Sequence, residues 1–354
     1  MPFTRSIFVG KLKLGGYLVA AVLTTMFGFN PARAFDNSAL PLLGEKLFFD
    51  KRLSRDGTIS CASCHRPELA FTDGRKLAIG IGERQGTRNT PSLLNSAFNT
   101  SQFWDGRRDS LETQALDPFL NASEHGFDSA GALLKLLRED EQYRAAFKRA
   151  FAGRPTQIAV THVASAIAAF QRTLVDLDTP FDRFQFRNEK AAMSVSAQRG
   201  LRLFQGAARC ASCHLISNDS ALLTDNKFHA LGVGVPRIER RLPALAAQLI
   251  KIKDSGGLDE ATFNDQDLAE LGRFAVTLNP VDIGKFRTPS LRNIALTAPY
   301  MHDGSVATLE EAVELEIYYR GIEMQRPLVL TAAEKDDLMQ FLNALTNTNP
   351  KKFK

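Results

Sequence analysis

The same five residues, Cys-Ala-Ser-Cys-His, stand at positions 61–65 and again at positions 210–214. Together the two motifs use all four cysteines of this 354-residue chain. A Cys-x-x-Cys-His sequence is typical of covalent attachment of a c-type haem. Its two thiols add to the vinyl groups of one porphyrin, and the histidine that follows binds the iron. The two motifs therefore predict two covalent haems in one chain.

Three other interpretations of the paired cysteines explain less. A redox-active Cys-x-x-Cys needs no histidine directly after it. A zinc site built from four thiolates would use both pairs but leave both histidines as coincidences. Two disulfides would each close a very short loop and stabilise little. We therefore predict His65 and His214 as iron ligands, with four attachment points at Cys61, Cys64, Cys210 and Cys213.

The sequence around the motifs is also repeated. Gly-Glu-Lys-Leu-Phe at 44–48 precedes the first motif, and Gly-Leu-Arg-Leu-Phe at 200–204 precedes the second. Thr-Pro-Ser-Leu at 90–93 returns at 288–291. The offset between the copies grows from 149 to 198 residues, so the second copy carries 49 extra residues, broadly within 219–283. We predict an internal duplication with domains at 35–185 and 186–354.

Hydrophobic periodicity predicts a mainly helical protein. Apolar residues recur near a period of 3.6 in 129–151, 156–174, 194–204, 308–320 and 331–345. Thr308 and Glu311 form a plausible capping box, and no segment alternates as a strand. The stretches 50–127 and 205–305 are rich in Gly, Pro, Asn and Asp. We expect them to be loops that a large prosthetic group organises.

Residues 1–34 have the pattern of a secretory signal peptide. Three basic residues precede an apolar stretch, and Ala-Arg-Ala at 32–34 offers a cleavage site. The apolar stretch is short and interrupted by glycines, which argues against an uncleaved membrane anchor. Removing this segment lowers the net charge from +5 to +1, so the charge does not indicate nucleic-acid binding. We expect a periplasmic protein with no stable membrane insertion after cleavage.

Further ordered motifs resemble the bacterial di-haem cytochrome c peroxidase and MauG family over roughly residues 40–346. They are Arg-Asn-Thr-Pro-Ser at 88–92, Phe-Trp-Asp-Gly-Arg at 103–107, Leu-Thr-Asp-Asn at 223–226, Phe-Arg-Thr-Pro-Ser-Leu-Arg-Asn at 286–293 and Pro-Tyr-Met-His-Asp-Gly at 299–304. The resemblance implies two mainly helical cytochrome c-like domains. It also implies that the N-terminal haem reacts with peroxide and that the C-terminal haem transfers electrons.

The same resemblance implies roles for individual residues. Gln114 and Glu124 match the family's pair above the first haem, where Gln114 would orient peroxide and Glu124 would move a proton between its oxygens. Trp104, the only tryptophan, matches the residue between the haems, which relays an electron or holds a radical. The resemblance also implies a calcium site at Asn89, Thr297 and Pro299. One side-chain oxygen and two main-chain carbonyls would bind the ion there.

One departure from the family's pattern concerns the first haem. Many family peroxidases hold a second histidine on its iron, 16 residues after the motif histidine, and this ligand must leave before peroxide binds. This chain has Ile81 at that position, and isoleucine cannot bind iron. We therefore predict a first haem that is five-coordinate or weakly water-bound when both haems are ferric, with no need for reductive activation.

A second departure concerns the sixth ligand of the second haem. Family peroxidases use Met and MauG uses Tyr at the position that corresponds to Glu316. An anionic oxygen ligand would stabilise ferric and higher iron states more than Met does. Glu316 could instead pair with Arg320 along a helix and bind no metal. The other candidate ligands are Tyr318, Tyr319 and Met301.

We therefore expect a periplasmic di-haem oxidoreductase that reacts with hydrogen peroxide and shares oxidising equivalents between its haems. A detoxifying peroxidase would take electrons from a small cytochrome or cupredoxin. A MauG-like enzyme would withdraw them from a protein substrate, and the changes at Ile81 and Glu316 favour this chemistry. The alternative is a non-enzymatic electron carrier, which would have no use for an open first haem beside Gln114 and Glu124.

Overall fold

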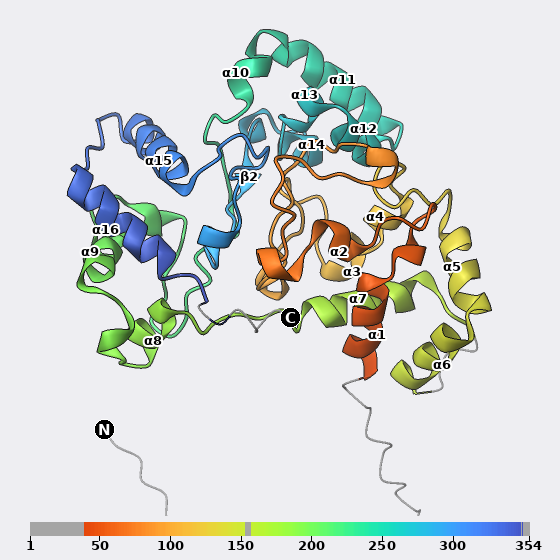
Figure 1. The fold of residues 1–354 in the computed structure, drawn as a ribbon. Coiled ribbons are helices and arrows are strands. Elements are labelled where there is room, and N and C mark those ends of the chain that lie inside the picture. Colours follow the sequence, from red (N-terminus) through yellow and green to blue (C-terminus); the bar gives the residue numbers. More distant parts are fainter. Residues whose placement is uncertain (1–38, 153–156, 348, 350–354) are drawn as a thin grey trace, which may run out of the picture. The chain divides into compact units, whose positions relative to one another are not determined.

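The computed structural model describes residues 39–152, 157–347 and 349, all within one compact unit, Asp36–Lys354. The predicted signal peptide, residues 1–34, lies outside these residues. Most of the regular structure is helical (Figure 1), which confirms the mainly helical prediction. Within the described part, no helix is long and apolar enough to span a membrane.

The elements fall into three groups along the chain. The first half contains α1 (Ala39–Phe49), α2 (Cys61–Cys64), α3 (Leu111–Gln114), α4 (Asp117–Leu120), α5 (Ala130–Glu139), α6 (Glu141–Ala150) and α7 (Val160–Gln171). Helix α8 (Pro180–Phe186) crosses the predicted domain boundary at 185/186, and its Phe181 packs in the apolar cluster of the second half. The second half also contains α9 (Val195–Gln205), α15 (Leu309–Glu323) and α16 (Ala332–Asn343). The region between α9 and α15 holds β1 (Phe228–His229), α10 (Val235–Ile238), α11 (Leu242–Asp254), α12 (Leu258–Asn264), α13 (Gln266–Ala269), α14 (Phe274–Thr277) and β2 (Phe286–Arg287).

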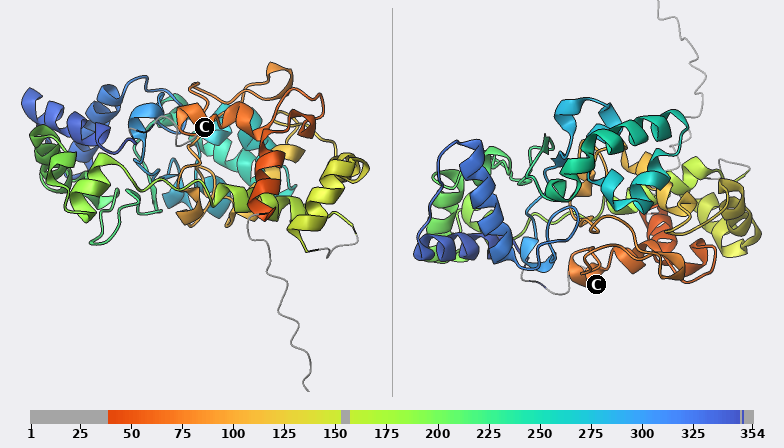
Figure 2. Two further views of the ribbon diagram at one scale, coloured as in Figure 1. Left: turned by 60° about the horizontal axis from the view of Figure 1, so that its bottom comes forward. Right: turned by 90° about the horizontal axis from the view of Figure 1, so that it is seen from above.

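The two halves repeat one helix crossing. Helix α1 packs on α7 at Gly44, where an added β-carbon would lie 1.9 Å from the Ala166 carbonyl oxygen. Helix α9 packs on α16 at Gly200, where a β-carbon would lie 1.9 Å from the Asp337 carbonyl oxygen. The α9–α16 pair is seen side by side in Figure 1 and in both views of Figure 2. Because both glycines hold the same place in the repeated sequence, this geometry supports the duplication.

The extra residues of the second copy build a helical group of their own. Helices α11, α13 and α14 enclose an apolar cluster that includes Leu245, Leu249, Leu268 and Phe274. The expectation of loops throughout 205–305 is wrong here, because the Leu245–Leu249 spacing already gives α11 a buried face. Figure 2 shows these teal helices gathered together.

Two further expectations need local correction. The single helix expected over 129–151 is two helices, because Asp140 ends α5 and its side chain caps α6 by accepting from the Tyr143 N–H (3.0 Å). The prediction of no strand is wrong for β1 and β2, an antiparallel pair with Phe228 opposite Arg287. Two residues are too few to show alternation. The capping box of Thr308 and Glu311 at the start of α15 is confirmed.

Candidate functional site

The first cysteine motif forms the short helix α2 and places His65 directly after it. The Nδ1 atom of His65 lies 3.0 Å from the carbonyl oxygen of Phe71, a residue held in the left-handed region at φ 60°. Because this contact occupies Nδ1, Nε2 is the ring nitrogen left for a metal. Burial lowers the pKa of His65, which keeps the ring in the neutral form that metals bind.

The second motif repeats this arrangement. The Nδ1 atom of His214 lies 2.8 Å from the carbonyl oxygen of Leu223, which is also left-handed at φ 56°. Burial lowers the pKa of His214 to about 4. A metal-binding histidine usually has its second nitrogen held by such an acceptor. Both histidines therefore have the surroundings of iron ligands, a property that the motif alone could not show.

The first motif lines a cavity of about 1300 Å³, a volume that includes its open mouth. Phe48 of α1 and Ile167 of α7 contribute to its wall, so the repeated helix crossing forms part of the site. The structure brings together in this one cavity the sequence-predicted residues Cys61, Cys64, His65, Trp104, Gln114 and Glu124.

Glu124 has the surroundings of a proton-transfer group. Burial raises the pKa of its carboxyl to about 7, and the guanidinium of Arg107 works against that rise. Arg107 lines the same cavity and lies 3.5 Å above the ring centroid of Phe103. It forms ion pairs of 3.0 Å with both Asp105 and Asp259. A carboxyl with a pKa near 7 can exchange protons at neutral pH.

Arg107 is a site residue that sequence reasoning did not single out. It ends the Phe-Trp-Asp-Gly-Arg motif at 103–107, and its place in that motif is the sequence feature that could have identified it. Its partner Asp259 comes from α12, far along the chain, and no local pattern connects the two.

Ile81 stands at the position where the family resemblance led us to look for a second histidine. Its side chain is buried and packs on Gly126, where an added β-carbon would lie 2.1 Å from Ile81 Cδ1. Its neighbours Ile79 and Gly80 line the first cavity, whereas Ile81 is not part of the wall. The open first haem stays a prediction.

A second cavity, of about 1280 Å³ with its mouth included, surrounds the second motif. Cys210, Cys213 and His214 line it, together with Phe204, which repeats the place of Phe48. The Arg320 guanidinium donates to the Cys213 sulfur at 3.3 Å. Free thiols and neutral histidines in both cavities fit covalent haem attachment.

The four candidate ligands of the second haem lie in different surroundings. Glu316 and Met301 line the second cavity. Tyr318 is 61% exposed, and the ring of Tyr319 lies against Gly232. Burial raises the pKa of Glu316, while Arg320 works against that rise. Glu316 therefore combines an oxygen ligand with a place in the cavity wall.

Trp104 lies between the two cavities and lines both. Its indole N–H donates to the Asn89 carbonyl oxygen at 2.9 Å, and its own carbonyl accepts from the Arg287 N–H at 2.8 Å. The Asn89 N–H in turn donates to the carbonyl of His302, which lines the second cavity. One short chain of hydrogen bonds thus connects the two sites.

Arg287 also lines both cavities, and sequence reasoning did not single it out. It is 6% exposed, and burial lowers its pKa to about 10. Within the described part of the chain its guanidinium meets only neutral oxygens, those of Asn99, Phe103 and Thr288. A buried cation without an anionic partner is costly. The two cavities therefore fit a ligand that carries carboxylates, such as a haem with its two propionates.

The residues of the predicted calcium site are placed as follows. Asn89 is buried, and its amide nitrogen donates to the Arg75 carbonyl at 2.9 Å, which leaves its amide oxygen for a cation. The Thr297 hydroxyl donates to Ile294, and Pro299 follows a cis peptide bond. Calcium at this site stays a prediction.

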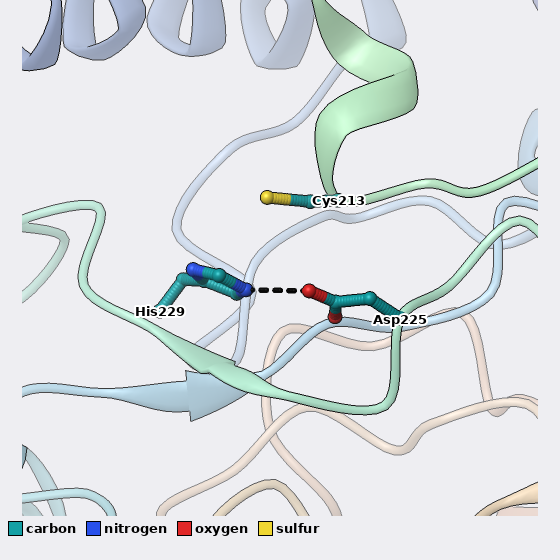
Figure 3. A group of neighbouring side chains, drawn as sticks. All are labelled: Cys213, Asp225 and His229. Carbon is teal, nitrogen blue, oxygen red and sulfur yellow. Dashed lines mark hydrogen bonds and ion pairs between the residues drawn. The ribbon is translucent and has the colours of Figure 1, made fainter.

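Asp225 and His229 form a pair beside the second motif. His229 Nε2 lies 2.8 Å from an Asp225 carboxylate oxygen, and the Cys213 sulfur is close to both (Figure 3). His229 lines the second cavity. Because Cys213 belongs to the haem-attachment motif, we interpret this group as part of the cavity wall.

Sequence and fold both match known di-haem enzymes. A family model described as di-haem cytochrome c peroxidase matches residues 38–191. Cytochrome-c peroxidase IdrP1 of Denitromonas iodatirespirans is 39% identical, over 87% of this chain and 81% of that protein. Methylamine utilization protein MauG of Methylorubrum extorquens is 36% identical, over 86% and 77%. The crystal structure of a MauG-like protein associated with microbial copper homeostasis has a TM-score of 0.72 and 34% identity, over 88% and 90%.

Proposed function

Because this chain belongs to the di-haem cytochrome c peroxidase family, we propose that it reacts with hydrogen peroxide in the first cavity and shares oxidising equivalents with a second haem. It is a peroxidase-type oxidoreductase by family. One observation carries the finer proposal: the attachment residues Cys61, Cys64 and His65 line the same cavity as Gln114 and Glu124.

The first cavity's own residues would divide the work as follows. Cys61, Cys64 and His65 would hold a haem in this cavity, and its iron would supply the electrons needed to break the O–O bond. Gln114 orients the peroxide by hydrogen bonding. Glu124, as the carboxylate, accepts the proton of one peroxide oxygen and returns it to the other, which leaves as water. A pKa near 7 lets Glu124 perform both transfers at neutral pH.

The second cavity would hold the haem that exchanges electrons with the first. His214 would bind its iron on one side, and Glu316 is the ligand we propose for the other. Trp104 and Arg287 support exchange between the sites because both residues line both cavities. We propose one haem domain at 35–185 and the other at 186–354, with calcium at Asn89, Thr297 and Pro299, in a periplasmic protein.

Two kinds of electron source are compatible with this site. The absence of a second histidine at Ile81 and of a methionine at Glu316 favours MauG-like oxidation of a protein substrate. Similarity to cytochrome-c peroxidase IdrP1 favours turnover with a small cytochrome or cupredoxin. A carrier without enzymatic activity is the remaining alternative.

A single experiment separates these functions. Stoichiometric hydrogen peroxide is added to the diferric protein, the absorption spectrum is followed, and a reduced small cytochrome is then titrated in. A long-lived oxidised protein with poor turnover supports oxidation of a protein substrate. Rapid multiple turnover supports a peroxidase. An unchanged spectrum after peroxide would contradict both and leave the carrier.

A further inference from the structure

The short helix α12 belongs to the extra residues of the second copy, yet it contacts segments of the first copy. The Thr87 hydroxyl donates to the Thr262 carbonyl at 2.6 Å, and both side chains are buried. The Ser123 hydroxyl donates to Asn264 at 2.9 Å. Since Ser123 directly precedes Glu124, the C-terminal end of α12 lies beside the proton-transfer residue of the first cavity.

An ion-pair cluster fixes the other end of α12. One Asp259 carboxylate oxygen lies 3.0 Å from Arg107 Nε and the other lies 2.5 Å from Arg108 Nη2. Arg107 itself lines the first cavity. Helix α12 is therefore held at both ends against the wall that contains Glu124.

Phe263 is the residue of α12 that lines the first cavity. Its side chain is buried, and its ring tip lies 2.8 Å from the point where a β-carbon on Gly86 would stand. The ring can lie this close only because residue 86 has no side chain. Phe263 thus adds an apolar surface, supplied by the second copy, to the pocket that holds Gln114 and Glu124.

We propose that Phe263 determines the size of the peroxide that this site accepts, admitting hydrogen peroxide and excluding hydroperoxides with a bulky alkyl group. The proposal rests on the proposed function, because it assumes peroxide reaction in the first cavity. Hydrogen peroxide needs room for two oxygens only. The hydrocarbon part of an alkyl hydroperoxide needs apolar space in the same cavity, and the Phe263 ring takes up part of that space.

The chemistry of a larger substrate would balance as it does for hydrogen peroxide. The O–O bond of the hydroperoxide breaks, and two electrons and two protons convert the molecule into one alcohol and one water. The electrons come from the same donor that supplies turnover with hydrogen peroxide. Only the group attached to the departing oxygen differs, so discrimination depends on space and not on a new step.

The test compares hydrogen peroxide with cumene hydroperoxide in the haem-loaded protein and in Phe263→Ala. Removing the ring leaves an apolar cavity, and such cavities accept aromatic ligands. We expect kcat/KM for cumene hydroperoxide to rise on the order of tenfold, the scale at which apolar pockets discriminate size. The value for hydrogen peroxide should change much less. Phe263→Leu should give an intermediate ratio of kcat/KM for cumene hydroperoxide to kcat/KM for hydrogen peroxide. This smaller change keeps the test valid if the alanine variant does not fold.

Leu258→Ala is the matched control, because Leu258 is on α12 but packs toward the insertion's own core and does not line the cavity. Equal effects of Leu258→Ala and Phe263→Ala would refute the proposal, since loosening of α12 would then explain both. An unchanged ratio in Phe263→Ala would refute it as well.

Binding of cyanide and of 4-phenylimidazole to the ferric first haem provides a readout without peroxide. Phe263→Ala should strengthen binding of the bulky ligand relative to cyanide. A wild-type protein that does not react with hydrogen peroxide would contradict the proposed function. The comparison of cyanide with 4-phenylimidazole would still decide whether Phe263 limits the size of a bound ligand.

Discussion

Glu124 is the residue on which the proposed chemistry depends most directly. Burial in the first cavity raises the pKa of its carboxyl to about 7, and the base form is needed to accept a proton from peroxide. We expect peroxide reactivity to rise with pH through an inflection near 7. Glu124→Gln should lower the rate by roughly 10²–10⁴-fold and abolish the inflection. Stopped-flow rates between pH 5 and 9 would check this, and a retained inflection would assign it to another group.

The same burial predicts an effect of Glu124 on stability. Its pKa is higher in the folded protein than the usual 4.5, so the folded state binds the proton more tightly and this contribution is lost as pH rises from about 4.5 to 7. Above pH 7 the penalty is on the order of 3 kcal/mol. Glu124→Gln should therefore stabilise the protein at pH 8 and leave it unchanged at pH 4, measured by urea unfolding.

Glu112 is the matched control, because a hydrogen bond from Arg172 lowers its pKa. Glu112→Gln should show the opposite sign, with a loss of stability at pH 8. Equal shifts for both variants would contradict burial as the cause of the Glu124 effect.

Glu316 can be tested as the sixth ligand of the second haem. Glu316→Gln removes an anionic oxygen, so we expect an altered ferric spectrum and a higher reduction potential of that haem. Glu314→Gln is the control on the same helix, since Glu314 pairs with Lys335 at 2.6 Å near the surface. Spectra of Glu316→Gln identical to the wild type would point to Met301, the other candidate that lines the cavity.

At the scale of elements, the two repeated helix crossings depend on their glycines. Alanine within a helix is normally favoured over glycine by up to about 1 kcal/mol. At Gly200, however, a β-carbon would lie 1.9 Å from a carbonyl oxygen of α16, and such overpacking costs typically 1–3 kcal/mol. We expect Gly200→Ala to lower the midpoint of thermal unfolding.

Gly131 in α5 provides the comparison for Gly200. It is exposed, and the nearest atom to an added β-carbon is Ser129 Oγ at 3.5 Å. Gly131→Ala should leave the unfolding midpoint unchanged or raise it. A fall of equal size in both variants would show that helix packing is not the reason.

Elements with local signals were predictable from the sequence, whereas elements that depend on their neighbours were not. The box of Thr308 and Glu311 correctly placed the start of α15. The break at Asp140 was missed because the apolar period continues across it, while a single side-chain cap decides the boundary. Helix α11 was missed because turn-forming residues around it outweighed its own pattern.

At the scale of the whole molecule, the sequence predicted the parts of the site and the structure shows how they meet. The proposed covalent attachment by Cys61 and Cys64 rests on local chemistry, so a motif suffices to predict it. The ion pair of Arg108 with Asp259 joins residues 151 positions apart, and no periodicity encodes it. Arg287 is part of the motif at 286–293, but the neutral oxygens that its guanidinium meets at Asn99 and Phe103 lie more than 180 positions away.

Trp104 is where the two halves of the molecule can be tested as one system. Trp104→Phe keeps an aromatic ring between the cavities but removes the N–H that donates to Asn89, whose own N–H donates to the His302 carbonyl. We expect electron transfer between the haems to slow by tenfold or more, equivalent to roughly 1.4 kcal/mol on the barrier. The measurement is re-reduction of the peroxide-oxidised protein by a reduced cytochrome.

Cyanide affinity of the first haem and the spectrum of the second should stay unchanged, which separates slower transfer from damage to either cavity. Unaltered re-reduction would mean that electrons pass between the halves by a route that avoids Trp104, with Arg287, the other residue shared by both cavities, as the next variant to measure.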